Sequence, residues 1–431
     1  MDQYQMKNLY DSGNQEEIAA LWQDAEEREQ FSEWDYIYVM NTFYKQKDYN
    51  ECLEVYRAFH KKYPDSDKLD DKMGWSCYHT KIKSFDFKAG DRSKLRQQAE
   101  YIISHSGQGN YSPKWFMVKY MLDQIKEGNF GQDISPQQQL LYLDQVDPES
   151  LSTASETRTL ENGRTIHSAY DREDWYRIRA KLLLAAEQYD ECIDCCDSAL
   201  QKLQAFGFHN DNDQWFRYRK AKSLFALGKA EEAGKYVHDI QARGLNHWCL
   251  WQLLFEMDRE TGQTDEAIAN GCKCALADPS HEMRIKFYEA FAEFLNVNGY
   301  ALEAALHRQL VVLIRKENDW NLKERHLAWS IPEEIAAKDK QAVLKDLKAF
   351  WREWQSKGKT YFQGTVKRLL GEGKSGFIEA DDGKNYYFNA RDFQRRNTIP
   401  QEGMRVKFTL VDKLDKSKGV VKPNATDISI I

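Results

Sequence analysis

The sequence predicts a mainly α-helical protein, in which a long array of paired helices is followed by a small five-stranded antiparallel β-barrel. Apolar residues recur three or four positions apart through most of the chain, which is the spacing of one helix face. The 431 residues include only 8 Pro and 23 Gly, which favours long helices. After residue 357, short strand-like runs separated by Gly and Asp replace the helical pattern.

The clearest pair of helices includes the segment Phe43–Pro64. Asp48 and Tyr49 lie between two helical patterns and are expected in the turn, and Pro64 is expected to end the second helix. The buried face of that helix is expected to carry Cys52, Tyr56 and Phe59.

The same pattern, a turn followed by small residues at helical spacing, recurs along the chain. Further turns are expected near Gly13, Gln188, Gly228, Gly262 and Gly299. Some of these turns lie 34 residues apart, and the other spacings are irregular. The units resemble tetratricopeptide repeats, which have this period. The resemblance implies an α-solenoid over residues 1–331, in which each helical pair hides its apolar face only against its neighbours.

The remaining helical segments are less regular. Helices are expected at 94–104, 113–126 and 136–144, and the stretch 150–163 is expected to be a long surface loop because it is rich in Ser, Thr, Glu and Gly. Residues 332–358 are expected to hold a final amphipathic helix that either caps the array or links it to the barrel.

The segment 359–431 contains several short motifs in a fixed order. They are G-T-V-K at Gly364–Lys367, G-F-I at Gly376–Ile378, D-D-G at Asp381–Gly383, N-Y-Y-F-N at Asn385–Asn389 and E-G-M-R-V-K-F at Glu402–Phe408. Together they resemble a cold-shock domain. The resemblance implies an oligonucleotide-binding (OB) barrel, which binds single strands by stacking bases on exposed aromatic rings.

Candidate nucleic-acid-binding residues follow from that resemblance and from the alternation of side chains along strands. Alternation places Phe377 and Tyr387 outward, with Ile378 and Phe388 inward. The full candidate set is Lys367, Arg368, Lys374, Phe377, Tyr387, Asn389, Arg391, Arg395 and Arg396. The sequence departs from the cold-shock pattern at Arg368, Ser375, Asn389 and Ala390, which replace aromatic or His residues and remove part of the stacking surface.

Charge is unevenly divided. The whole chain has a net charge of −7, whereas residues 359–431 alone carry +5 and the remainder −12. This distribution favours a polyanion as the ligand of the C-terminal segment.

A second candidate surface lies on the first helices of the repeat units, which line the concave face of a solenoid. Neighbouring basic residues there are expected to bind an acidic peptide or carboxylate. This candidate set is Arg177, Lys181, Trp215, Tyr218 and Lys222.

The sequence contains none of the common catalytic motifs, so no enzymatic activity and no cofactor are expected. Cys192, Cys195 and Cys196 resemble half of a zinc site, but no second pair follows, so they are interpreted as buried core residues and no metal is expected. The chain shows no signal-like start and no long apolar run, which favours a cytoplasmic protein without membrane contact. Repeat arrays often self-associate, and a homo-oligomer is one possibility.

These observations favour a non-catalytic adaptor. Its helical array would bind a protein or peptide, and its barrel would bind single-stranded nucleic acid, RNA in preference to DNA. Two alternatives stay open. The barrel could have lost nucleic-acid binding, leaving a pure protein-interaction scaffold, or the array could act as a sensor that closes on a peptide or small ligand.

Overall fold

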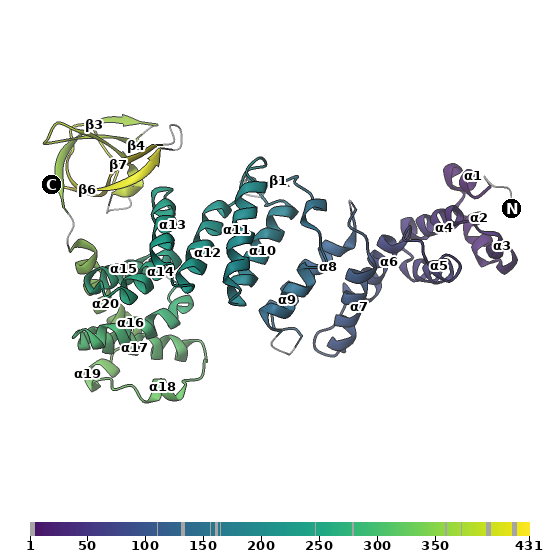
Figure 1. Ribbon diagram of the computed structural model, residues 1–431, viewed down its shortest axis with the longest axis horizontal. Helices are drawn as coiled ribbons and strands as arrows, with labels where there is room; N and C mark the ends of the chain where they lie inside the picture. Colours follow the sequence, from purple (N-terminus) through teal and green to yellow (C-terminus); the bar gives the residue numbers. More distant parts are fainter. Residues whose placement is uncertain are drawn as a thin grey trace. The chain divides into compact units, whose positions relative to one another are not determined.

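A computed structural model describes the chain from residue 5 to 431, apart from residues 110, 131–133, 156, 160–162, 164, 246, 278–279, 358–359, 372, 394–397 and 416–419. The chain divides into two compact units, Met1–Phe216 and Arg217–Ile431. The predicted order, a helical array followed by strands, is confirmed (Figure 1).

The first unit is almost entirely helical. Its helices are α1 (Gln5–Ser12), α2 (Gln15–Gln23), α3 (Ala25–Gln30), α4 (Glu33–Gln46), α5 (Tyr49–Lys62), α6 (Asp70–Cys77), α7 (Arg92–His105), α8 (Pro113–Lys126), α9 (Pro136–Leu143), α10 (Asp171–Ala185) and α11 (Tyr189–Lys202). The three helices predicted between 94 and 144 are therefore confirmed as α7, α8 and α9. A π-helical turn, η1 (Tyr78–Ile82), extends α6.

The segment 150–163 was predicted to be a loop, and this was wrong in part. It contains the short strand β1 (Thr157–Thr159), which pairs antiparallel with β2 (Thr165–His167). β-branched Thr residues favour extended backbone. The compositional signal for a loop therefore concealed a small hairpin.

Helix α12 (Asn212–Ala226) crosses the boundary between the units. The helices that follow are α13 (Ala230–Ala242), α14 (Trp248–Glu260), α15 (Thr264–Leu276), α16 (Ile285–Val297), α17 (Ala301–Glu317), α18 (Glu324–Leu327), α19 (Glu333–Ala336) and α20 (Lys340–Ser356). Consecutive helices such as α14 and α15, or α16 and α17, pack together as hairpins.

The predicted turns between paired helices are confirmed by their backbone. Each contains one residue in the left-handed region, which reverses the chain directly after a helix. These residues are Lys47 (φ 62°), Glu187 (φ 60°), Gly228 (φ 76°), Gly262 (φ 74°) and Gly299 (φ 88°). Asp48, predicted in the first turn, caps α5 by accepting a hydrogen bond from the backbone N–H of Glu51 at 3.1 Å.

Small residues allow neighbouring hairpins to approach closely. A methyl group added to Gly271 on α15 would lie 2.5 Å from the ring of Phe291 on α16. Cys52, Cys192, Ala233 and Ala304 occupy related positions and are fully buried. The role of small residues inferred from the repeat pattern is confirmed here.

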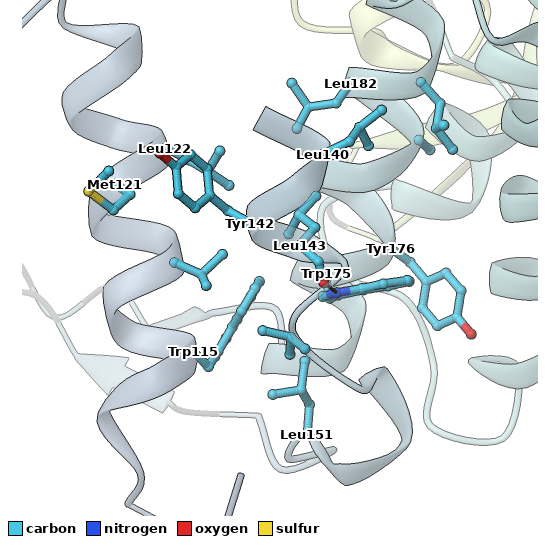
Figure 2. Close-up of a cluster of buried hydrophobic side chains, with 14 of the residues drawn as sticks. Trp115, Met121, Leu122, Leu140, Tyr142, Leu143, Leu151, Trp175, Tyr176 and Leu182 are labelled. Carbon is cyan, nitrogen blue, oxygen red and sulfur yellow. Dashed lines mark hydrogen bonds between the residues drawn. The ribbon is translucent and has the colours of Figure 1, made fainter. Parts of the chain in front are cut away.

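The core of the first unit is rich in aromatic side chains. Trp115, Tyr142 and Trp175 come from α8, α9 and α10 and gather with Leu residues between these helices (Figure 2). The indole N–H of Trp175 donates to the backbone oxygen of Leu143 at 3.3 Å. Burying rings of this size contributes much of the apolar stabilisation between successive helices.

Helix α20 packs against α15 and α17, so it caps the helices of the second unit. Trp351 is fully buried, and its indole N–H donates to His307 Nε2 at 3.0 Å. His281 Nδ1 lies 2.7 Å from the hydroxyl of Tyr288 in the same core. Burial lowers the pKa of both His281 and His307 to about 4, which keeps them neutral near pH 7.

Five strands follow: β3 (Phe362–Leu370), β4 (Ser375–Ala380), β5 (Asn385–Asn389), β6 (Arg405–Asp415) and β7 (Val420–Ile430). They close in the order β3-β4-β5-β7-β6. The prediction of a wholly antiparallel barrel was wrong at one place, because β5 and β7 pair in parallel, at Tyr387 and Asn424. After β5 the chain continues into β6 and then turns back into β7. Strand β7 lies beside β5 and runs in the same direction.

Two glycines of the predicted motifs are required by the close approach of the strands. A methyl group on Gly364 would lie 2.4 Å from the backbone oxygen of Glu379, and one on Gly376 would lie 2.4 Å from that of Arg368. The core inside the strands contains Val366, Ile378, Phe388, Phe408 and Ile428, all at most 1% exposed.

Candidate nucleic-acid interface

A row of side chains crosses four neighbouring strands of the barrel. Arg368 on β3 lies opposite Phe377 on β4, Phe377 lies opposite Tyr387 on β5, and Tyr387 lies opposite Asn424 on β7. Residues directly opposite one another on paired strands project from the same face of the sheet. We call these four residues the platform row.

The two aromatic rings of the platform row contact each other. Their centroids are 5.7 Å apart and the rings are inclined by 74°, an edge-to-face arrangement. Both side chains are partly exposed, whereas Ile378 and Phe388, the next residues along each strand, are fully buried. The predicted outward and inward positions of these four residues are confirmed.

An irregularity in β3 brings Arg368 into the row. Val366 is buried opposite Ile378, so strict alternation would turn Arg368 inward as well. The register shifts between Val366 and Arg368, leaving Lys367 as an extra residue. Lys367 and Arg368 are both exposed as a result. The Lys367 ammonium lies 2.7 Å from Glu379 Oε1, so an acidic neighbour already compensates its charge.

The other described candidates lie to one side of the row, toward the β3–β4 turn. Asn389 is opposite Ser375, and its side-chain oxygen accepts from the backbone N–H of Arg391 at 3.0 Å, capping a short 3₁₀ turn. Lys374 is an exposed residue of the β3–β4 turn, and its backbone oxygen accepts from Ala390 N–H at 2.9 Å. Arg391 is exposed. Arg395 and Arg396 lie outside the described residues.

Three residues near the row were not among the sequence candidates. Asn424 belongs to the row, and Lys422, two positions earlier on β7, projects from the same face. Lys413 on β6 lies opposite Lys422, and its ammonium is 3.4 Å from Asp392 Oδ1. The pairing of β6 with β7 depends on a register that the sequence does not encode locally.

One strong ion pair lies among the other charges of the barrel. Arg405 donates to Asp381 through both terminal nitrogens, at 2.7 and 3.1 Å. These hydrogen bonds lower the pKa of the Asp381 carboxyl. The guanidinium of Arg405 is therefore already paired with a carboxylate of the barrel.

The candidates on the helical array are divided between the two units. Arg177, Lys181 and Trp215 belong to the first unit, and Tyr218 and Lys222 to the second. Arg177 donates to Asp174 Oδ1 at 3.0 and 2.8 Å through two nitrogens, and Lys181 is exposed. Trp215, Tyr218 and Lys222 are partly buried on α12, and burial raises the pKa of Tyr218.

Cys192, Cys195 and Cys196 are buried in the core of the first unit. The Cys192 thiol donates to the backbone oxygen of Ala180 at 3.4 Å. Within the described part of the chain, no group of three or more His, Cys, Asp or Glu side chains is arranged to hold a metal ion. Of the helices described, none has the length and apolar content needed to cross a bilayer.

Residues 214–357 match the family model described as Domain of unknown function (DUF7017). A search of curated proteins found no match. A crystal structure of the APC/C hetero-tetramer Cut9-Hcn1 is similar at a TM-score of 0.32 and 11% identity, covering 78% of this chain and 58% of that one. The chain spans less than two thirds of the length of that protein.

Proposed function

We propose that this protein is a non-catalytic adaptor that joins a protein partner to single-stranded nucleic acid. In this proposal the barrel is an OB barrel of the cold-shock type and binds the nucleic acid, RNA in preference to DNA. The helical array is of the tetratricopeptide type and binds a protein or peptide. Two modest affinities on one chain reinforce each other when both ligands are part of one assembly.

The platform row is the observation that carries the nucleic-acid part of the proposal. Phe377 and Tyr387 are partly exposed, adjacent and in register, with the guanidinium of Arg368 beside them. Bases stack on aromatic rings and on guanidinium planes, and basic side chains attract the phosphates. Lys374 and Lys422 supply positive charge close to the row.

The arrangement of helical hairpins supports the protein-binding part. Within the units, helices that follow one another in sequence pack together, as α9 and α10 do, which leaves extended surfaces on which peptides can bind. Arg177 and Lys181 project from the first helix of the hairpin formed by α10 and α11, one turn apart.

The decisive experiment measures binding of fluorescein-labelled single-stranded RNA and DNA to the full-length chain by fluorescence anisotropy at two salt concentrations. The double variant Phe377→Ala, Tyr387→Ala should bind at least ~30-fold more weakly, since each stacked base contributes about 1–3 kcal/mol. Ile399→Ala, which removes an exposed apolar side chain elsewhere in the same segment, serves as the control and should bind normally.

A pure protein-interaction scaffold is the second candidate function. It is favoured by two observations, the pairing of Lys367 with Glu379 and the use of the Asn389 oxygen in a local cap. Failure of the full-length chain to bind either nucleic acid at low salt would leave this second function as the better explanation.

A further inference from the structure

A groove in the first unit is separate from the platform row and from the candidate residues on first helices. It has a volume of about 500 Å³ and is lined by side chains from α5, from α6 with η1, and from α7. None of the residues that line this groove was among the sequence candidates. Its volume lies within the range of ligand-binding sites in proteins.

The floor of the groove is apolar and fixed in position. Leu53, Tyr56 and Met73 form it, and each is at most 8% exposed. The Tyr56 hydroxyl donates to Asp70 Oδ1 at 2.9 Å, which satisfies its polar end. The ring of His60 stacks on Tyr56 with centroids 5.7 Å apart. A floor held in this way favours insertion of an apolar side chain.

The rim of the groove is positively charged. Arg57, Lys61 and Lys81 are exposed there, and none of the described residues that line the groove is Asp or Glu. Arg57 also pairs with Glu54 outside the groove, in an exposed contact that contributes little to stability. Carboxylates of a ligand would therefore meet cations at the rim.

The position of Lys81 depends on an unusual backbone. It lies in η1, where the N–H of Lys83 donates to the backbone oxygen of Tyr78 at 2.9 Å, five residues earlier. π-helical turns are rare, and they occur frequently at functional sites because they change the direction of side chains.

The groove is open along its length, since six of its eleven lining residues are exposed. An open groove of this kind suits a segment of polypeptide better than an enclosed small molecule. We propose that it binds a peptide segment in which a bulky apolar side chain is flanked by Asp or Glu. This inference deepens the protein-binding part of the proposed function by naming the chemistry of the partner.

The test uses the full-length chain and short fluorescein-labelled peptides with a central Leu, Phe or Trp flanked by Glu, by Ser or by Lys. The Glu-flanked peptides should bind best. The triple variant Arg57→Glu, Lys61→Glu, Lys81→Glu should weaken their binding at least ~10-fold, and the single variant Lys81→Gln should weaken it less. Lys83→Glu changes a neighbouring exposed charge that does not line the groove, and it should bind as the native chain does.

Three outcomes would overturn the inference. Equal binding of all peptides would show that charge is not recognised. Binding that resists the triple variant but is lost in Arg177→Glu, Lys181→Glu would place the peptide on first helices, which preserves the proposed function and rejects the groove. A dimer of the free chain that the triple variant dissociates, seen by light scattering without peptide binding, would make a second copy the occupant.

Discussion

The groove on α5–α7 and the platform row on the barrel use similar residues in opposite geometries. Both combine aromatic rings with cations. In the groove three helices surround a recessed apolar floor, so one side chain can enter and its neighbours meet the rim. On the barrel the rings lie side by side on the outside of a sheet, where successive flat groups can stack. If both proposals hold, the supporting backbone, more than residue type, selects the class of ligand in these two regions.

The helical part and the barrel also differ in how their stability responds to acid. All ten His residues lie before residue 327, so the barrel segment has none. The barrel also has no Trp, whereas the helical part contains all twelve. Trp fluorescence therefore reports on the helices alone, which allows the two regions to be perturbed and observed separately.

The largest effect of a single substitution is expected from Gly376→Ala in the barrel. The added methyl group would contact the Arg368 backbone oxygen and the Phe388 ring, and we expect a loss of about 3 kcal/mol in barrel stability. Amide exchange of residues 362–430 should accelerate while the Trp unfolding midpoint stays constant. Gly383→Ala, at φ 84° but with open space around it, should cost only about 1 kcal/mol. Similar effects for the two variants would contradict this account.

Acid should destabilise the helices selectively. The pKa values of His281 and His307 are about 4 in the folded chain, below the ordinary value of 6.5, so the unfolded chain binds more protons between these values. The contribution of the two neutral histidines to the free energy of unfolding is fully present above pH 6.5. It falls as the pH decreases toward 4, by about 2 kcal/mol per histidine at pH 5. Urea unfolding followed by Trp fluorescence measures this loss. His307→Gln keeps an acceptor for Trp351 and should reduce the pH dependence; an unchanged dependence would show that His307 does not cause it.

A smaller effect should separate two adjacent basic residues of the barrel. Arg368→Ala should weaken binding of single-stranded RNA by about 1 kcal/mol, because its guanidinium lies in the platform row. Lys367→Ala should change the affinity less than ~2-fold, because Glu379 already compensates its charge. Anisotropy titrations of both variants make the comparison, and a larger loss in Lys367→Ala would reverse the assignment.

The smallest effect is expected at Lys413 and Lys422, beyond the end of the row. The double variant Lys413→Gln, Lys422→Gln should make binding less dependent on salt. The slope of log affinity against log salt should fall by about 0.7 for each phosphate that these ammonium groups neutralise. The preference for particular bases should not change. Titrations over a series of salt concentrations measure the slope. A slope equal to that of the native chain would place the phosphates elsewhere.

Much of the fold could be predicted because local rules determine it. The turns at Gly228, Gly262 and Gly299 follow from the need for a left-handed residue after a helix. Lys47 and Glu187 adopt the same conformation without being Gly, and the periodicity around them was a sufficient signal. The β1–β2 hairpin was missed because its composition indicates a loop, and the parallel join between β5 and β7 was missed because non-local pairing decides it.

The residues of the candidate site likewise divide into those that local rules predict and those that depend on long-range pairing. Strand alternation correctly placed Phe377 and Tyr387 outward, since it needs only the period of two. Alternation alone would have turned Arg368 inward, and its position depends on the irregularity after Val366. Asn424 and Lys422 could not be placed from the sequence, because their positions depend on the pairing of β7 with β5 and β6. The α5–α7 groove brings together residues 53 to 101, and no short motif marks such a combination.

The parallel join between β5 and β7 has a mechanical consequence. It rests on one registered pair, Tyr387 with Asn424, and on a separate bridge between Phe393 and Ile428. Among the strand pairs that the structure describes in the barrel, this is the shortest join, and it lies within the platform row itself. A polymer bound along the row would cross-link β4, β5 and β7 from outside. A bound ligand would then limit how far the barrel can open, and this restraint would be lost when the ligand dissociates.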